Sequence, residues 1–175
     1  MIRIGIGFDV HRFSDVSENR PLILMGIHIP FDRGLTGHSD ADVMIHALID
    51  ALLGAAGLGD IGQHFPDADP SYKGIDSTEL LQRVIADINL RGWQVVNADV
   101  GLIGERPKIG PYRSAMRERI APMLGIQPEA LNIKATTTEK LGFTGRGEGL
   151  AAQAVAMICD SRLGVKHGGE HAEDF

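Results

Sequence analysis

A dense run of apolar residues between positions 43 and 53 sets the strongest limit on the fold of this chain. Val, Met, Ile and Leu are frequent enough here to predict a largely buried helix that ends at the glycines between 54 and 57. Ser39 or Asp40 is expected to cap its start, and Ser39 with Asp42 three residues later forms a capping-box pattern. The rest of the fold must therefore cover most sides of this helix.

The polar residues of this helix, Asp42, His46 and Asp50, are spaced four apart and so form one stripe on a single face. Burying unpaired polar groups costs a few kcal/mol each, so the stripe requires polar partners. Asp9 and His11 are the candidates, because they follow an expected strand and project to the same side if the extended backbone continues.

Two histidines and one carboxylate are a ligand set typical of catalytic zinc sites, which keep a fourth position open. Asp9, His11 and His46 would supply this set, with Asp42 or Asp50 accepting from the second ring nitrogen of a histidine. The alternative is that both histidines are ordinary hydrogen-bonded residues, because Asp-x-His is by itself a weak signal. The pattern leaves both interpretations open.

The remaining periodicity predicts a single mixed α/β domain over residues 1–160, an α/β sandwich with helices on one face of a mixed β-sheet. The last strand is apolar on both faces, which is typical of a central strand. A polar tail over residues 161–175 is expected to be flexible. The expected strands cover residues 2–8, 22–30, 93–103, 131–135 and 150–159, and the expected helices cover 43–53, 76–91 and 111–124. In the strand 93–103, one face is expected to carry Val96, Ala98, Val100 and Leu102.

Composition narrows the class of protein. The chain has 175 residues and a net charge of -6, which argues against a general nucleic-acid-binding surface. Because the chain has no apolar run of about 20 residues and no signal peptide, neither membrane insertion nor secretion is expected. The single cysteine, Cys159, excludes an internal disulfide and suits a cytoplasmic protein.

Two loops carry residues suited to phosphates, and a third carries residues suited to hydroxyl groups. Consecutive threonines, Glu139 and several glycines between 136 and 149 suit a phosphate held with a hard divalent cation. Residues 106–108 are positioned to bind an anion, and the acidic residues of the long segment 57–76 to grip hydroxyl groups. The alternative for each is a solvated turn. With no nucleophile–base pair evident, the pattern indicates metal-assisted phosphoryl chemistry and goes no further.

Six motifs, in order, give the chain a specific resemblance. They are GFDVH (7–11), HSDADV (38–43), LGDIG (58–62), FPD (65–67), RPK (106–108) and ATTTEKLGFTGRGEG (135–149). Over about residues 1–160 the chain resembles the 2-C-methyl-D-erythritol 2,4-cyclodiphosphate synthases of the non-mevalonate isoprenoid pathway. The long final motif is the most specific.

The resemblance implies a homotrimer whose sheets surround a threefold axis, with an active site at each subunit interface. It implies a lyase reaction in which 4-diphosphocytidyl-2-C-methyl-D-erythritol 2-phosphate is cyclised and CMP is released. Asp9, His11 and His46 would hold zinc, and Glu139 would hold magnesium or manganese. His38 and Thr137 would lie near the transition state as catalytic residues.

The resemblance also implies the substrate contacts. Ser39 and the start of the following helix would meet phosphates. Residues 60–62 and 65–69 would hold the methylerythritol group, and residues 104–110 with Thr136 would form the cytidine pocket. An isoprenoid diphosphate could occupy the axial cavity, beside Arg146 and Glu148. The implied substrate-binding positions are Asp9, Val10, His11, His38, Ser39, Asp60, Ile61, Gly62, Phe65, Pro66, Asp67, Ala68, Asp69, Gly104, Pro107, Lys108, Ile109, Thr136, Thr137, Thr138, Glu139, Phe143 and Arg146.

The sequence is also compatible with two alternative functions. A zinc phosphoesterase acting on a nucleotide diphosphate would use water as the nucleophile and release a linear product. A non-catalytic trimer that senses isoprenoid diphosphates would release no CMP. The retention of both metal-ligand sets and both phosphate loops favours the synthase.

Overall fold

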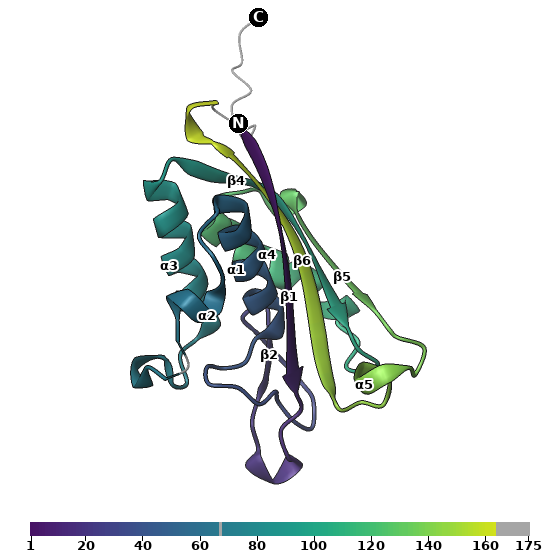
Figure 1. Cartoon of the computed structure of the whole chain (residues 1–175). Helices are drawn as coiled ribbons and strands as arrows, with labels where there is room; N and C mark the ends of the chain where they lie inside the picture. The colour runs from purple at the N-terminus through teal and green to yellow at the C-terminus, as the bar shows by residue number, and fades with distance from the viewer. Residues whose placement is uncertain (67, 164–175) are drawn as a thin grey trace, which may run out of the picture.

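The fold is built on one four-stranded sheet in the order β1-β6-β4-β5 (Figure 1). The computed structural model describes residues 1–66 and 68–163. β1 (Ile2–Arg12) and β4 (Trp93–Ile103) run antiparallel to β6 (Gly149–Asp160), and β5 (Leu131–Thr136) runs parallel to β4. The predictions of a mixed sheet and of a central last strand are confirmed.

The long helices cover one face of this sheet (Figure 1). They are α1 (Val43–Ala56), α3 (Ser77–Leu90) and α4 (Arg113–Leu124). A separate hairpin, β2 (Leu22–Leu24) with β3 (Ile27–Ile29), turns at Met25 and Gly26 as predicted. Within the described ranges, no helix is both long enough and apolar enough to cross a membrane.

The two segments predicted as long loops contain short helices. α2 (Ile61–His64) lies in the first and α5 (Gly142–Gly145) in the second. The helix predicted over residues 111–124 begins two residues later than expected, because Pro111 lies in a 3-10 turn that leads into α4. The 3-10 turns are Val16–Glu18, Pro70–Tyr72, Gly110–Tyr112, Pro128–Ala130 and Ser161–Leu163. The last of these begins the predicted tail, whose residues 164–175 lie outside the described ranges.

Helix α1 packs directly on the backbone of β1. A Cβ atom on Gly5 would lie 2.0 Å from the Ala51 carbonyl oxygen, and one on Gly7 would lie 1.9 Å from that of Ala47. Two residues of strand advance about 6.6 Å and four residues of helix about 6 Å. Every second residue of β1 therefore faces every fourth residue of α1. The next residues of β1 on this side, Asp9 and His11, are thereby aimed at the start of α1.

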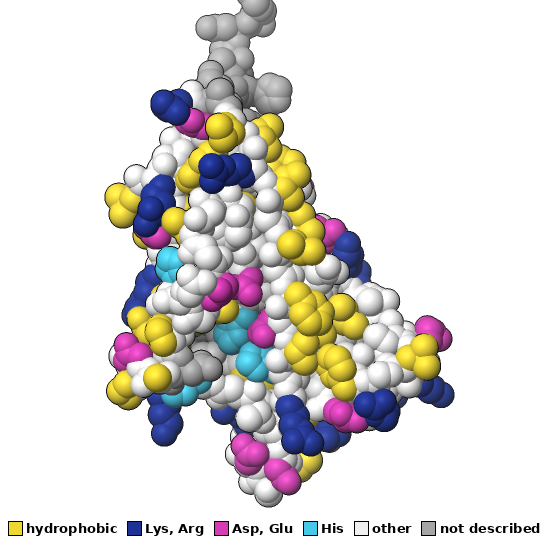
Figure 2. Space-filling view, in the orientation of Figure 1, with side chains coloured by type: hydrophobic (Ala, Val, Ile, Leu, Met, Phe, Trp, Pro, Cys, Tyr) yellow, Lys and Arg dark blue, Asp and Glu magenta, His cyan; other side chains and the backbone are white. Residues whose placement is uncertain are grey.

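The opposite side of β1 is apolar and exposed. Ile2, Ile4, Ile6 and Phe8 are each more than half exposed, although all are large hydrophobic residues. Figure 2 shows hydrophobic side chains in a band along β1, beside a hollow that contains histidines. A single chain therefore leaves one face of its sheet uncovered, and large uncovered apolar patches mark interaction surfaces.

Two predicted details of the strands were wrong. β1 continues to Arg12 instead of ending near Phe8, because it pairs with β6 along its whole length. In β4 the pairing with β6 shifts between Val95 and Asn97, and this bulge turns Val95 into the core in place of the predicted Val96. A bulge of one residue reverses the face of every residue on one side of it.

Candidate metal centre

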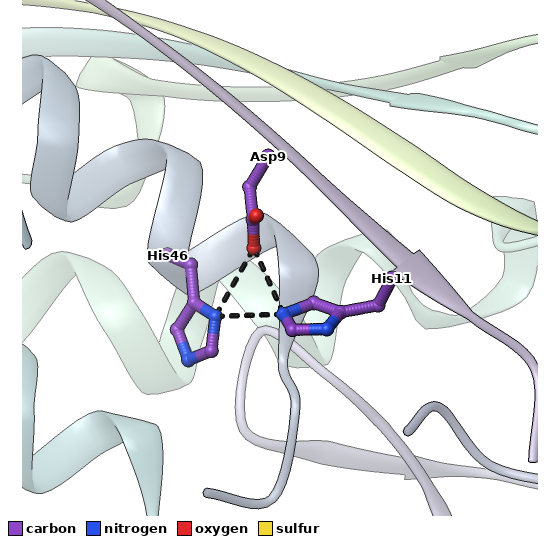
Figure 3. A group of neighbouring side chains, drawn as sticks. All are labelled: Asp9, His11 and His46. Atoms are coloured by element: carbon purple, nitrogen blue, oxygen red, sulfur yellow. Dashed lines mark hydrogen bonds and ion pairs between the residues drawn. The ribbon is translucent and has the colours of Figure 1, made fainter. Parts of the chain in front are cut away.

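Asp9, His11 and His46 point at one another where the end of β1 meets the first turn of α1 (Figure 3). His11 Nε2 lies 3.0 Å from Asp9 Oδ2 and 3.0 Å from His46 Nδ1, and His46 Nδ1 lies 3.1 Å from Asp9 Oδ2. Tetrahedral zinc with bonds of about 2.0–2.1 Å places its ligand atoms about 3.3 Å apart. The triangle is therefore close to the size that a divalent metal ion requires.

The hydrogen bonds around the triangle also favour a cation. His11 Nδ1 lies 2.9 Å from the carbonyl oxygen of Thr36, which only accepts, so Nδ1 carries the hydrogen and neutral His11 presents a bare Nε2. Asp9 Oδ2 is likewise an acceptor. Two lone-pair atoms 3.0 Å apart repel unless a proton or a metal ion lies between them. The residues present thus fit a divalent metal ion.

The pKa values of Asp9 and His11 also reflect how closely these side chains approach one another. Without a metal ion, protons on the two rings take its place: burial would raise the pKa of Asp9, but hydrogen bonds from protonated His11 and His46 offset this and hold it well below its ordinary value. Burial would lower the pKa of His11, but the hydrogen bond to Asp9 and its charge raise it. The carboxylate therefore stays ionised and attracts positive charge to the centre of the triangle.

The expected outer partners of the histidines are wrong. Asp42 is the N-cap of α1, in place of Ser39 or Asp40, and accepts from the backbone N–H groups of Met44 and Ile45. Those amides are consequently not free for a phosphate. Asp50 accepts from the Ile61 N–H group at 2.7 Å and so joins α1 to the start of α2.

His46 Nε2 instead meets two hydroxyl groups. It lies 2.9 Å from Ser77 Oγ, at the start of α3, and 3.1 Å from Ser39 Oγ. Ser77 is absent from the predicted site, because in the sequence it is explained by the start of a helix. No spacing in the chain links Ser77 to a residue 31 positions earlier.

The metal triangle opens into a cleft of about 240 Å³, which appears as the histidine-lined hollow in Figure 2. Of the predicted contacts, this cleft gathers the triangle with His38, Ser39, Ile61, Gly62 and Phe65, and it adds Tyr72 and Leu80. His38 Nε2 is buried and has no hydrogen-bond partner among the described residues. A buried imidazole nitrogen without a partner is available to a ligand in this cleft.

Some predicted contacts of the segment 60–69 do not line this cleft. Asp60 and Asp69 act as helix caps, accepting from the N–H groups of Gln63 and Ser71. Pro66 and Ala68 are exposed, and Asp67 lies outside the described residues. In a single chain, the carboxylates of Asp60 and Asp69 therefore serve the backbone of their own segment.

A second set of predicted residues lies away from the metal triangle. This set, the Glu139 group, consists of Thr136, Thr137, Thr138 and Glu139. Glu139 follows β5, and β5 and β1 form opposite edges of the sheet, three strand spacings or about 14 Å apart. Glu139 is exposed, has a φ of 52°, and accepts from the Thr137 hydroxyl at 3.0 Å. A non-glycine residue in this left-handed region is uncommon and points to a constrained turn.

Glu105 organises the turn that carries Glu139. Its Oε1 accepts from the N–H groups of Thr138 and Lys140, both at 3.2 Å. This contact joins two predicted groups: Thr136, Thr137, Thr138 and Glu139 on one side, and Gly104, Pro107, Lys108 and Ile109 on the other. The side chain of Ile109 is buried in the core, so only its backbone can meet a ligand.

The end of the segment 136–149 returns to β1. Phe143 and Glu148 line a shallow hollow together with Val10 and His11. Arg146 and Glu148 form an ion pair, with Nε 2.6 Å from Oε1. The structure thus places Phe143 near the metal triangle, but leaves Glu139, Thr137 and Lys108 outside its cleft.

Comparison with known proteins is consistent with this site. The YgbB family model matches residues 2–159. The 2-C-methyl-D-erythritol 2,4-cyclodiphosphate synthase of Desulfatibacillum aliphaticivorans is 59% identical over 157 residues, covering 90% of this chain and 99% of that protein.

Solved structures agree with the sequence comparison. A 2C-methyl-D-erythritol-2,4-cyclodiphosphate synthase in a CDP-bound form is 37% identical, with a TM-score of 0.81 over 90% of this chain and all of that one. The bifunctional IspDF of Campylobacter jejuni is 43% identical, with a TM-score of 0.86 over 93% of this chain, which spans 44% of that longer protein. On these matches and on the geometry above, the chain belongs to the YgbB family.

Proposed function

We propose that this protein is a metal-dependent 2-C-methyl-D-erythritol 2,4-cyclodiphosphate synthase of the non-mevalonate isoprenoid pathway. It cyclises 4-diphosphocytidyl-2-C-methyl-D-erythritol 2-phosphate and releases CMP. The observation that carries this proposal is the triangle of Asp9, His11 and His46 on the wall of a cleft, in a chain 59% identical to a synthase of that name. Residues 1–160 would act as one synthase domain.

The proposed reaction needs charge control more than acid–base chemistry. The attacking 2-phosphate and the β-phosphate that it attacks are both anionic, so repulsion and alignment dominate the barrier. Asp9, His11 and His46 would hold zinc, and Glu139 would hold magnesium or manganese. A cation at such a site neutralises and polarises phosphate oxygens.

The chain's own residues then bind and orient the substrate. His38 Nε2, which has no partner among the described residues, is free to donate to a phosphate oxygen in the cleft. Ile61, Gly62 and Phe65 line the same cleft and would contact the methylerythritol group there. The nucleophile belongs to the substrate, which explains why the site needs no activated serine or cysteine.

A homotrimer would complete the site. Two observations support this: the Glu139 group and the metal triangle lie at opposite edges of one sheet, and the sheet face carrying Ile4, Ile6 and Phe8 is exposed. Packing the exposed faces around a threefold axis would bury them and bring the Glu139 group of one subunit to the cleft of the next. An isoprenoid diphosphate on that axis, near Arg146, belongs to the same proposal.

The test is to incubate the purified protein with the cytidine substrate and magnesium and to follow the products by phosphorus NMR. CMP together with a cyclic diphosphate is the expected result. CMP with a linear diphosphate would identify a hydrolase. A zinc-loaded trimer that releases no CMP would contradict both enzymes and favour the sensor.

A further inference from the structure

His46 can bind a metal through Nδ1 only if its ring is oriented and protonated correctly. Nδ1 faces Asp9 and His11, while Nε2 faces the hydroxyl groups of Ser77 and Ser39. A neutral imidazole carries one hydrogen, so a hydrogen on Nε2 leaves Nδ1 bare for a metal, and a hydrogen on Nδ1 blocks it. The groups around Nε2 therefore decide whether His46 is a ligand.

Ser77 cannot donate to His46, because its hydrogen is already committed. The Ser77 hydroxyl donates to Asp40 Oδ1, and the Ser77 backbone N–H donates to Asp40 Oδ2 at 3.1 Å. An ionised carboxylate accepts only. Ser77 Oγ thus presents a lone pair to His46 Nε2, 2.9 Å away, and this contact is favourable only if Nε2 carries the hydrogen.

Ser39 alone would not place the hydrogen of His46 on Nε2. Its Oγ accepts from the Ala41 N–H at 3.1 Å, which leaves its own hydrogen free to point at His46 Nε2 or at Ser77 Oγ, 3.4 Å away. A hydrogen donated by Ser39 would favour a bare Nε2 and a blocked Nδ1. With Ser77 present, that arrangement would set two lone pairs 2.9 Å apart.

The surroundings hold Ser77 and Asp40 in place. Ser77 is completely buried at the first position of α3. The Asp40 N–H donates to the carbonyl oxygen of Ile75 at 3.0 Å, and the Gly74 N–H donates to that of His38 at 2.7 Å. The end of the segment 57–76 is thus clamped to residues 38–40, so α3 and the metal triangle form one connected unit.

We propose that Ser77, held by Asp40, is a positioning residue that fixes His46 with its hydrogen on Nε2 and its Nδ1 turned to the metal. The inference rests on the proposed metal site and names two residues outside the predicted site roles. Outer partners of metal-binding histidines typically change metal affinity by about 10- to 100-fold. Asp40→Ala is expected to act in the same direction, because it removes the acceptor of the Ser77 hydroxyl hydrogen and so releases that hydrogen toward His46.

The test compares Ser77→Ala with Thr78→Ala. Thr78 is the matched control: it is also buried at the start of α3, and its hydroxyl donates to Asp76, with no hydrogen bond to His46. Zinc dissociation constants are measured by competition with a chromophoric chelator, with circular dichroism as a check of folding. Ser77→Ala is expected to weaken zinc binding by about 10- to 100-fold and Thr78→Ala to leave it unchanged. Equal zinc affinities in folded Ser77→Ala and wild type would overturn the proposal.

A second readout needs no enzyme activity. In the zinc-loaded wild type, nitrogen NMR of the imidazoles is expected to detect a slowly exchanging hydrogen on His46 Nε2, and Ser77→Ala is expected to speed its exchange. Ser77→Thr, which retains the hydroxyl, should restore slow exchange and zinc affinity. If His46 Nε2–H exchanges equally fast in all three proteins, Ser77 has no positioning role. A protein that binds zinc in this way but forms no cyclic product would contradict the proposed function and not this inference.

Discussion

Asp42 is a fully buried carboxylate whose ionisation opposes folding. Burial raises its pKa to about 6 from an ordinary value of 3.8, although the N–H group of Gly26 and those of α1 oppose the shift. Because the folded protein holds this proton more tightly than the unfolded chain, the contribution of Asp42 to stability falls as pH rises from about 4 to 6 and stays low above it.

Comparison of metal-free wild type with Asp42→Asn tests this prediction. The free energy of unfolding of the wild type, relative to the variant, should increase by about 2 kcal/mol when the pH is lowered from 7 to 4, since each pKa unit is worth about 1.4 kcal/mol. Urea denaturation at both pH values measures it. Asp32→Asn, at an exposed position, is the control. Parallel pH profiles for the wild type and Asp42→Asn would contradict the prediction.

Glu139 is the proposed ligand of the second cation. Its carboxylate is exposed and, among the described residues, accepts only from the Thr137 hydroxyl, so it can bind a hard cation. Glu139→Gln should raise the half-saturating concentration of magnesium or manganese roughly tenfold or more, because a neutral amide is a poorer ligand for these ions. Metal titrations of CMP release measure the effect, with exposed Glu129→Gln as the control. An unchanged titration would remove Glu139 from metal binding.

At the scale of elements, the contact of α1 with β1 fixes the distance between His46 and its two partners. A Cβ on Gly7 would lie 1.9 Å from the backbone oxygen of Ala47, and backbone cannot move aside as a side chain can. Gly7→Ala should therefore push α1 away from β1. We expect a loss of stability of about 1–3 kcal/mol and weaker zinc binding, measured by denaturation and by chelator competition.

Gly101→Ala provides the matched control for this contact. Gly101 is also a strand glycine, but a Cβ there would come no closer than 3.5 Å to its nearest neighbour, the flexible side chain of Lys134. Its substitution should leave zinc affinity unchanged. If both alanine variants behave alike, the close approach of α1 and β1 does not control the metal centre.

At the scale of the whole molecule, the uncovered sheet face predicts assembly. Ile6 is 64% exposed in the single chain, so Ile6→Lys should fold normally but lose the proposed trimer, because lysine would be buried without a partner at the subunit contact. Sedimentation and light scattering measure the mass, and CMP release should fall with it. Leu90→Lys changes a residue that is 87% exposed on α3 and should remain trimeric. A trimeric Ile6→Lys protein would exclude this face as the contact.

The sequence by itself determined the order of elements, the central strand β6 and the grouping of Asp9, His11 and His46. These follow from local rules: strand alternation put Asp9 and His11 on one side, and helical spacing put His46 on a buried face. It also supported membership of a family, because six motifs in order carry that information independently of three-dimensional contacts.

Only the tertiary structure decided the outer partners of the site. Ser77 reaches His46 from the start of another helix, and the bulge in β4 replaces Val96 by Val95 in the core. Neither follows from local pattern, because each depends on contacts between residues distant in the chain. The same reason explains why alternating isoleucines in β1 predicted a strand but not its exposed face: Gly5 and Gly7, without side chains, allow α1 to approach, so the apolar residues turn outward.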